Sequence, residues 1–333
     1  MPSPGPGEPV RARARSADSG DGSPRRRDEI ALRLPPGAAP AGRRIYRIAG
    51  RRLVSELALD RLAPFEEHGP WTAAPRCRAP GDDGAGTLLF GGDGWVGGRL
   101  RRVECRAAGG GYRLEVAGAG RFEVGADGAV DCLWLDPGAP PDLVAETLLG
   151  PALILALGLH GVFCLHAAAV VREGRAAVLV GPSGCGKSTL AAGLARAGEW
   201  RRIADDVLPV EPASGGPVAR PDFPQLKLAA AAQTVGGSAT PLGALYLLAP
   251  PAGGRRAGRA MLRPLPAHEA ALALARHTVA ARLFGPALLA GHLAACAAIA
   301  ERVPVSRLVY PHHAGSIAAV AGLLAGPSAM AAS

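Results

Sequence analysis

Residues 179–198 read LVGPSGCGKSTLAAGLARAG, and this stretch decides the fold. It contains the pattern G-x-x-x-x-G-K-[ST] from Gly181 to Ser188, with an apolar run before it and a helix-like run after it. Glycines let backbone amides approach phosphate oxygens, the lysine reaches the β- and γ-phosphates, and the serine hydroxyl ligates Mg²⁺. The stretch therefore predicts a P-loop within an α/β fold. The expected phosphate-binding residues are Gly181, Pro182, Ser183, Gly184, Cys185, Gly186, Lys187, Ser188 and Thr189.

The net charge is basic but does not indicate nucleic-acid binding. The chain has 333 residues, 48% of them hydrophobic, and a net charge of +9. The charges are spread along the chain and aromatic residues make up only 4%, so the sequence has no basic stripe with interleaved aromatics. Lys187 and Lys227 are the only lysines among 37 basic residues. This chain uses arginine almost everywhere, yet it has a lysine at the loop position where a compact ammonium must reach a phosphate. This choice supports the assignment of the stretch as a P-loop.

The cysteines and one long apolar run give two further expectations. Six scattered cysteines, with no C-x-x-C pair and no secretory signal, predict reduced thiols in a cytoplasmic protein. Residues 147–171 carry no charge, but Pro151, Gly158 and Gly161 interrupt them. We therefore expect a buried helix near 142–159 and a buried strand near 162–171, and no membrane span.

Composition divides the chain into three parts. Residues 1–40 are rich in Pro, Gly, Ser and Arg without an apolar period, which predicts a disordered tail. Residues 41–138 hold short alternating runs separated by glycine-rich turns, which predict a small antiparallel β domain. Residues 139–333 alternate between strand and helix patterns, which predict an α/β catalytic domain. Its expected strands are 175–181, 201–210, 244–250, 259–265 and 304–311, and its helices 186–198, 266–283, 285–303 and 314–326.

Acidic residues and one histidine lie near the loop in sequence. Asp205 and Asp206 end a short apolar strand in RRIADDVLPV, and His166 lies fifteen residues before Gly181 on the strand expected to form a hairpin with that of the loop. Paired carboxylates beside a nucleotide can hold Mg²⁺ and accept a proton from an attacking hydroxyl. The alternatives are an ordinary Asp-Asp turn and a histidine packed in a core.

Together these pieces resemble the catalytic domain of the HPr kinase/phosphorylase family. The shared elements are His166 on the strand before the loop, the loop itself, and Ala204-Asp205-Asp206 after the next strand. The sequence also resembles a divergent branch of this family found with gene clusters for ribosomally made peptides, including lasso peptides, through FPQLKL at 223–228 and ERVPVSRLVYP at 301–311. The similarity covers about residues 140–330. ABC-type ATPases share the loop spelling, but their LSGGQ-like segment and Asp-Glu pair do not follow here.

The resemblance implies a P-loop kinase domain of the HPr kinase C-terminal type that uses ATP and Mg²⁺. It implies Asp205 as the base, Asp206 and Ser188 for the metal, His166 orienting the acidic pair, and Lys187 on the transferred phosphate. The family's second signature, an acidic residue followed by Arg-Gly and a glycine-rich run, does not occur in the sequence. We therefore expect a kinase without phosphorylase activity, whose second metal carboxylate is unassigned and has Glu211 as its candidate.

The expected acceptor is a Ser or Thr hydroxyl on a peptide or small protein, in particular a ribosomally made precursor such as a lasso peptide. The extended segment 220–228, with Arg220 and Lys227, suits a flexible chain end, although a plain structural connection is the alternative. The family also implies a possible homo-oligomer. A small-molecule kinase, a relative of ATP-using carboxykinases, and a nucleotide-binding scaffold with little turnover are the competing functions.

Overall fold

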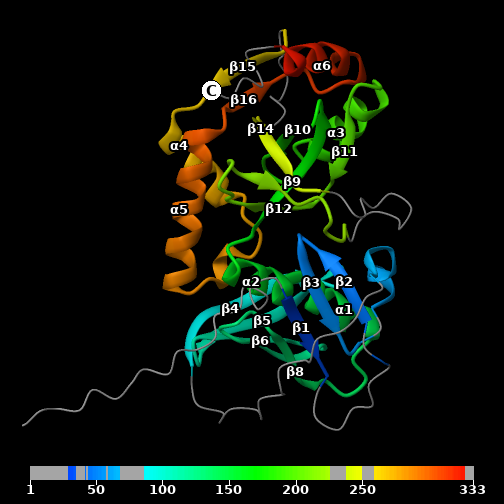
Figure 1. Ribbon diagram of the computed structural model, residues 1–333, viewed down its shortest axis with the longest axis vertical. Coiled ribbons are helices and arrows are strands. Elements are labelled where there is room, and N and C mark those ends of the chain that lie inside the picture. Colours follow the sequence, from blue (N-terminus) through cyan, green and yellow to red (C-terminus); the bar gives the residue numbers. More distant parts are fainter. Residues whose placement is uncertain are drawn as a thin grey trace, which may run out of the picture.

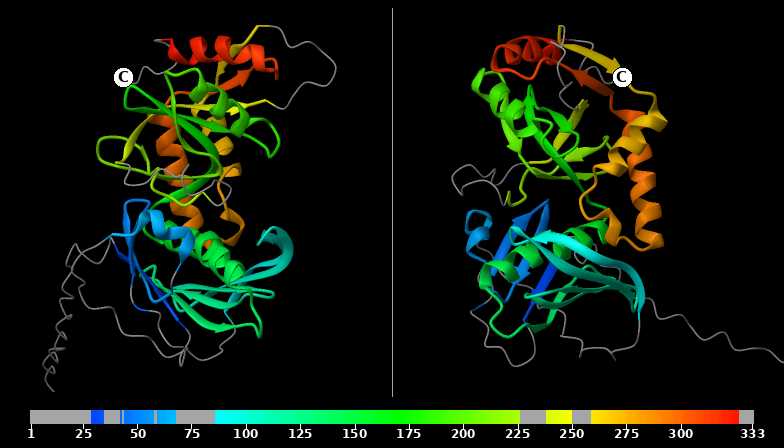
Figure 2. Two further views of the ribbon diagram at one scale, coloured as in Figure 1. Left: turned by 90° about the vertical axis from the view of Figure 1, so that its right-hand side faces the viewer. Right: turned by 180° about the vertical axis from the view of Figure 1, so that it is seen from behind.

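The structure is a computed structural model that describes residues 29–34, 42, 44–57, 59–67, 86–225, 238–249 and 259–326. Two eight-stranded sheets lie one above the other, each with helices packed on it (Figure 1). The fold is thus mixed α/β, as the sequence predicted. Figure 2 shows the same two halves from the side and from behind.

The lower sheet has the strand order β2-β3-β1-β8-β7-β6-β5-β4. Its apolar residues form one hydrophobic cluster that includes Leu32, Tyr46, Phe122 and Val130. A short 3₁₀ helix, Asp60–Phe65, covers one end and adds Phe65 to this cluster. The strands are Glu29–Arg33 (β1), Arg44–Ile48 (β2), Arg51–Ser55 (β3), Thr87–Val96 (β4), Arg99–Ala108 (β5), Gly111–Val116 (β6), Gly120–Val124 (β7) and Val130–Leu135 (β8).

Strand β1 departs from the sequence prediction in two ways. It lies within the stretch expected to be a disordered tail, yet it is a central strand with Ile30 and Leu32 buried. It also pairs in parallel with both β3 and β8, whereas the sequence predicted an antiparallel sheet. EIALR is too short to show a period and is flanked by charged and Pro-rich residues, so its burial depends on partners far along the chain.

The apolar helix expected near 142–159 is present and packs on the lower sheet. It consists of α1 (Pro141–Thr147), a π-helical turn (Leu148–Ala152) and α2 (Leu153–Leu159). The turn contains Pro151, which lacks a backbone N–H and interrupts the helical ladder. The run Pro141–Leu159 is long and apolar enough to span a membrane, but 67% of its most apolar 18-residue window is buried inside the protein. Leu148, Leu153 and Leu157 belong to the cluster of the lower sheet.

The upper sheet has the order β10-β9-β12-β13-β14-β16-β15, with β11 beside β9 and β10 also beside β14. Helices cover both faces, which gives three layers. One hydrophobic cluster joins the sheet to α3 and α6, and the other joins it to α4 and α5. The strands are Phe163–Arg172 (β9), Arg175–Val180 (β10), Arg201–Ala204 (β11), Val207–Glu211 (β12), Val218–Ala219 (β13), Thr240–Leu248 (β14), Met261–Pro264 (β15) and Val305–Val309 (β16).

The helices of the upper half are α3 (Lys187–Arg196), α4 (Ala267–Arg276), α5 (Pro286–Arg302) and α6 (Ile317–Ala325), with short 3₁₀ turns at Ala281–Leu283 and Ala314–Ser316. Helix α4 ends at Arg276 and not near residue 283 as predicted. After it, Thr278 pairs with Leu165 of β9, and this backbone pairing is incompatible with further helix.

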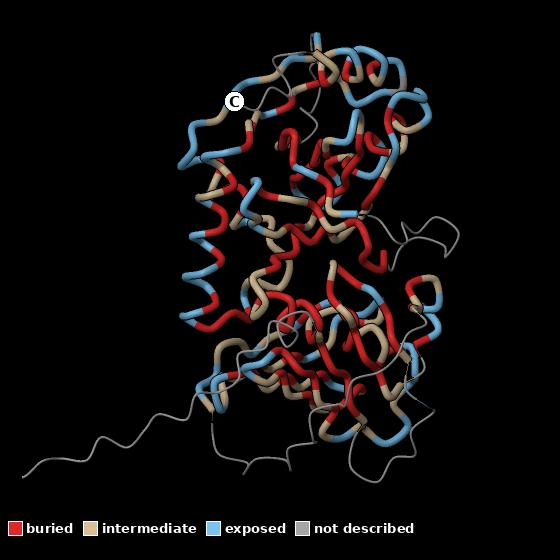
Figure 3. The backbone as a smooth tube through the Cα atoms, in the orientation of Figure 1, coloured by how far each residue is buried: buried red, intermediate tan, exposed pale blue. Residues whose placement is uncertain are grey.

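Helix α5 connects the two halves (Figure 2). Leu288 near its start belongs to the lower hydrophobic cluster, whereas Cys296 and Ile299 belong to the cluster of the upper sheet. Figure 3 shows this helix buried on the side that faces the protein and exposed on the other. One helix therefore contributes to both cores, so the halves share buried surface.

Candidate functional site

The predicted P-loop runs between β10 and α3 in the upper half. Gly186 is the N-cap of α3 in a left-handed conformation, with φ of 88°. A side chain at Gly181 would meet the Cys185 sulfur at 2.8 Å, so the loop closes only around a glycine. Cys185 itself is buried and fills the space beneath the loop. Gly181 is therefore required by the lack of space for a side chain, and Gly186 by its left-handed backbone conformation.

Lys187 and Ser188 begin the helix at the loop. The Lys187 ammonium donates to the carbonyl oxygens of Gly181 and Pro182, at 2.8 and 2.9 Å, and is 6% exposed. The amine is thus held over the loop that it is expected to serve. The outer surface of the loop is exposed at Pro182, Ser183, Gly184, Ser188 and Thr189.

The structure brings the acidic pair to this loop. Asp205 and Asp206 form the turn between β11 and β12, and the Ser188 hydroxyl lies 3.4 Å from the Asp205 carbonyl oxygen, to which it donates. The Asp205 Oδ2 lies 3.7 Å from Arg202 Nη1. The other oxygen, Oδ1, is buried without a hydrogen-bond partner among the described residues.

His166 lies on β9, which forms the predicted hairpin with β10. Its Nδ1 is 3.7 Å from Asp206 Oδ1. In the pairing of β9 with β12, His166 lies opposite Val207, the residue that follows Asp206. The fold therefore brings His166 to the acidic pair, and specifically to Asp206. The four residues expected to be catalytic lie around one loop end.

Gln225 holds the acidic turn in place, and the sequence did not identify it for this role. Its side-chain oxygen accepts from the backbone N–H groups of Asp205 and Asp206, each at 3.0 Å, and from Val207 at 3.4 Å. Its amide nitrogen donates to the carbonyl oxygens of Val207 and Phe223. The side chain is 2% exposed. It belongs to the FPQLKL segment, but a lone glutamine carries no sequence signal for such contacts.

His277 is a second residue near the site that sequence reasoning missed. Its carbonyl oxygen accepts from the His166 backbone N–H at 2.7 Å. Burial, and then the charges of Lys187 and His166, lower the pKa of its imidazole. His277 is therefore held close to the loop, in surroundings that favour the neutral form of its imidazole. The sequence placed it inside a helix, so no pattern connected it with the loop.

Glu211, the candidate for a second metal carboxylate, is engaged elsewhere. One of its oxygens pairs with Arg51 at 2.7 Å, and the other pairs with Arg220. Burial raises the pKa of Glu211, but the hydrogen bonds and charges of the two arginines outweigh this and lower it overall. The residue joins the upper half to β3 of the lower half. Lys227 lies outside the described residues.

The donor set can accommodate Mg²⁺ if a nucleotide supplies the remaining ligands. The described residues contain no group of three His, Cys, Asp or Glu side chains that could hold a metal ion on their own. Mg²⁺ usually takes only one or two carboxylates together with phosphate oxygens and water. The Ser188 hydroxyl and the Asp206 carboxylate, which belongs to the turn that Ser188 contacts, would hold the ion at the end of the loop.

Comparison with known proteins gives one result of note. No protein-family model matches the chain, and no curated protein matches it. Among solved structures, the HPr(Ser) kinase/phosphatase from Coxiella burnetii is similar, with a TM-score of 0.27 and 13% sequence identity. The match covers 48% of this chain and 93% of that chain.

Proposed function

We propose that this protein is an ATP- and Mg²⁺-dependent kinase that transfers a phosphoryl group to a hydroxyl. The observation that carries the proposal is the contact between Ser188 of the loop and the turn of Asp205 and Asp206. A P-loop alone fits many nucleotide-binding proteins. A half-buried acidic pair and a histidine at the end of the loop supply what a transfer to a hydroxyl needs in addition.

In this proposal each residue has one task. Lys187 binds the transferred phosphate, and Ser188 with Asp206 holds Mg²⁺, which neutralises phosphate charge when bound. Asp205 accepts the proton of the attacking hydroxyl. Among the described residues its Oδ1 accepts no hydrogen bond, so this oxygen is not engaged by another group. His166 holds Asp206, which keeps the two carboxylates in different roles.

The acceptor that we propose is a Ser or Thr of a peptide or small protein, such as a ribosomally made precursor of the lasso type. The support is the resemblance of FPQLKL to the peptide-associated branch. The described part of this segment also contacts the acidic turn, since Phe223 and Gln225 are buried and Gln225 accepts from the Asp205 and Asp206 backbone N–H groups. Lacking the second signature of the family, the protein is expected to transfer phosphate in one direction only.

The test is incubation of the full-length protein with Mg²⁺, labelled ATP and three sets of acceptors: serine peptides, sugars and nucleosides. We expect label on peptides only, and none when Ser is replaced by Ala. Label on sugars or nucleosides with every peptide unmodified would favour the small-molecule kinase. ATP binding without transfer to any acceptor would favour the scaffold. Release of acceptor by added phosphate or pyrophosphate would contradict the one-way reaction.

A further inference from the structure

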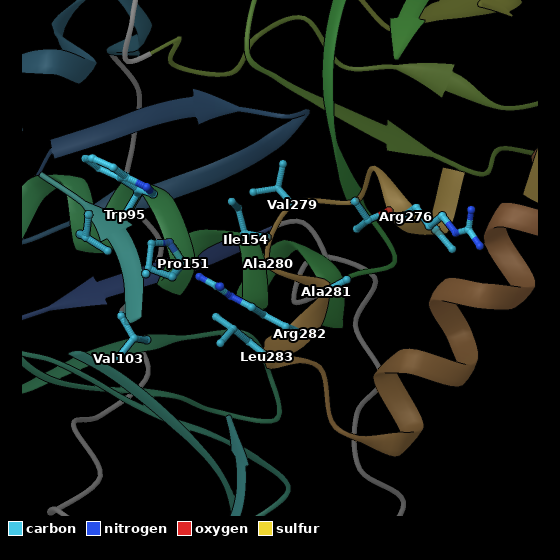
Figure 4. Close-up of a pocket in the computed structure, with 14 residues that line it drawn as sticks. Trp95, Val103, Pro151, Ile154, Arg276, Val279, Ala280, Ala281, Arg282 and Leu283 are labelled. Atoms are coloured by element: carbon cyan, nitrogen blue, oxygen red, sulfur yellow. The ribbon is translucent and has the colours of Figure 1, made fainter. Parts of the chain in front are cut away.

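A cavity of about 450 Å³ lies between the two halves of the molecule (Figure 4). The lower half contributes β4, β5 and the kinked helix, and the upper half contributes the chain that follows α4. Most of its wall is apolar. The main lining residues are Trp95, Val103, Pro151, Ile154, Val279 and Leu283.

The cavity contains a positive charge without a matching negative one. The Arg282 side chain extends across it toward Pro151, whereas Arg276 points away (Figure 4). The Arg282 guanidinium lies over the Phe90 ring, 4.5 Å from its centre. No described lining residue is acidic, and Arg282 has no ion pair with a described carboxylate. Arg282 is exposed, so the carboxylate of a ligand can reach its guanidinium.

The mouth of the cavity is apolar and exposed. Trp95 lines the cavity and is 72% exposed, and Leu100, its partner across the β4–β5 hairpin, is 60% exposed. Large apolar side chains this exposed, next to a cavity, are typical of a surface that binds a partner. An apolar residue of the ligand would cover them.

The wall of the cavity is directly connected to the candidate site. The lining residues Arg276, Thr278 and Val279 flank His277, whose carbonyl oxygen accepts from the His166 backbone. The Val279 backbone N–H donates to Cys164, two residues before His166. A flexible chain bound in the cavity thus lies beside the strand that carries His166.

From these observations we infer that the cavity binds the acceptor chain through an apolar side chain and an adjacent carboxylate, which Arg282 pairs. The inference rests on the proposed function and specifies its substrate: a peptide with Leu-like and Asp- or Glu-like residues near the phosphorylated Ser. The apolar residue packs on Trp95 and the cavity wall. Charge complementarity selects an acidic over a basic chain.

The test uses the full-length protein and two dye-labelled pools of twelve-residue peptides. Each pool fixes one Ser and one Leu; the first places Asp or Glu beside the Leu, and the second places Lys or Arg there. Fluorescence anisotropy should show the acidic pool binding about two- to fivefold more tightly, as expected for an ion pair with an exposed arginine. Equal binding of both pools, or preference for the basic pool, would overturn the inference.

Variants identify the cavity as the cause of that preference. Arg282→Glu should abolish or reverse it, and Trp95→Ala should weaken both pools about equally. Arg263→Glu, an exposed residue of β15 in the upper half, is the matched control and should keep the preference. Retention of the acidic preference by Arg282→Glu would refute the role of the cavity. Trp95 is mostly solvent-exposed, so Trp95→Ala should leave the core intact. This variant therefore still tests the cavity if Arg282→Glu does not fold.

Phosphoryl transfer measured on the same pools separates this inference from the proposed function. Arg282-dependent binding without any transfer would support the cavity as a peptide site and contradict the kinase. Transfer to Ser that is the same in wild type, Arg282→Glu and Trp95→Ala would support the kinase and contradict the cavity as the acceptor site. Acid-preferring transfer that Arg282→Glu removes would support both.

Discussion

The two halves of this protein are built from sheets of equal strand number but differ in what they bury. The lower sheet closes over apolar side chains, and its buried Arg33 pairs with Asp131 at 2.9 Å. The upper sheet buries Lys187 and one oxygen of Asp205 at the end of its glycine-rich loop. The lower half also has buried polar atoms without a described partner, such as the Tyr46 hydroxyl, but the upper half brings a lysine, two carboxylates and a histidine together at its loop. The upper half therefore has the features of a site and the lower half those of a support.

The lower half nevertheless contacts the site at two places. The turn between β2 and β3 docks on the segment before Gln225, where the Gly50 backbone N–H donates to Asp222 at 2.9 Å. The β4–β5 hairpin forms part of the cavity beside the strand of His166. Residues of the lower half can therefore position reactive groups that belong to the upper half. The predictions below test this division, from the largest effect to the smallest.

Replacement of Lys187 should have the largest effect. Lys187→Ala removes the cation over the loop, so transfer should fall by about three orders of magnitude or more and ATP should bind more weakly. Lys187→Arg should not rescue transfer, because a planar guanidinium cannot take the place of a compact ammonium. Calorimetry and a labelled-ATP assay measure both effects. Unchanged ATP affinity in Lys187→Ala would contradict the assignment of the loop.

Replacement of Asp205 should separate chemistry from binding. Asp205→Asn keeps the shape but removes the base, so transfer should fall by about two to four orders of magnitude while ATP still binds. Single-turnover kinetics at saturating ATP measure the effect. If Asp205→Asn remains active and Asp206→Asn is inactive, the roles of the two carboxylates are reversed.

Replacement of Gln225 should give a smaller effect that acts through position. Gln225→Ala leaves the backbone groups of the acidic turn without partners, which should cost about 1–3 kcal/mol of stability. Transfer should fall about ten- to a hundredfold, as expected for a misplaced base. The readout is kcat at saturating ATP, together with denaturant unfolding. A stability loss with kcat intact would show that Gln225 holds the fold but not the chemistry.

The contact between the halves should depend on pH through Glu211. Burial raises the pKa of Glu211, but Arg51 and Arg220 hold it below that of an ordinary glutamate overall. Its stabilising pairs are therefore intact at neutral pH and are lost as the pH falls through the folded-state pKa. Glu211→Gln should therefore lower the free energy of unfolding at pH 7 and have less effect at pH 3.5. Urea unfolding at both pH values measures this. An effect that grows on acidification would contradict the assignment.

The sequence predicted most elements of the upper half, and the reasons are local. The hairpin of β9 and β10, the loop, α3, and the acidic turn between β11 and β12 all follow from glycines, apolar runs and chain spacing. The predicted hairpin placed His166 near the acidic pair or the phosphates, and the folded chain decides for Asp206. The prediction failed where a short segment depends on distant partners, as with β1, and where a strand-like pairing ended α4 early at Arg276.

By itself the sequence determined the loop, its lysine and the candidate acids, because each is specified by residue types at fixed spacing. The tertiary structure alone decided which partners they have: His166 on Asp206, Gln225 beneath the acidic turn, Glu211 between two arginines, and Arg282 in a cavity shared by both halves. Each of these contacts joins residues from different elements, and their chain separation leaves no local pattern. The partners of these residues are set by burial and hydrogen bonding between distant segments, and these occur only in the folded chain.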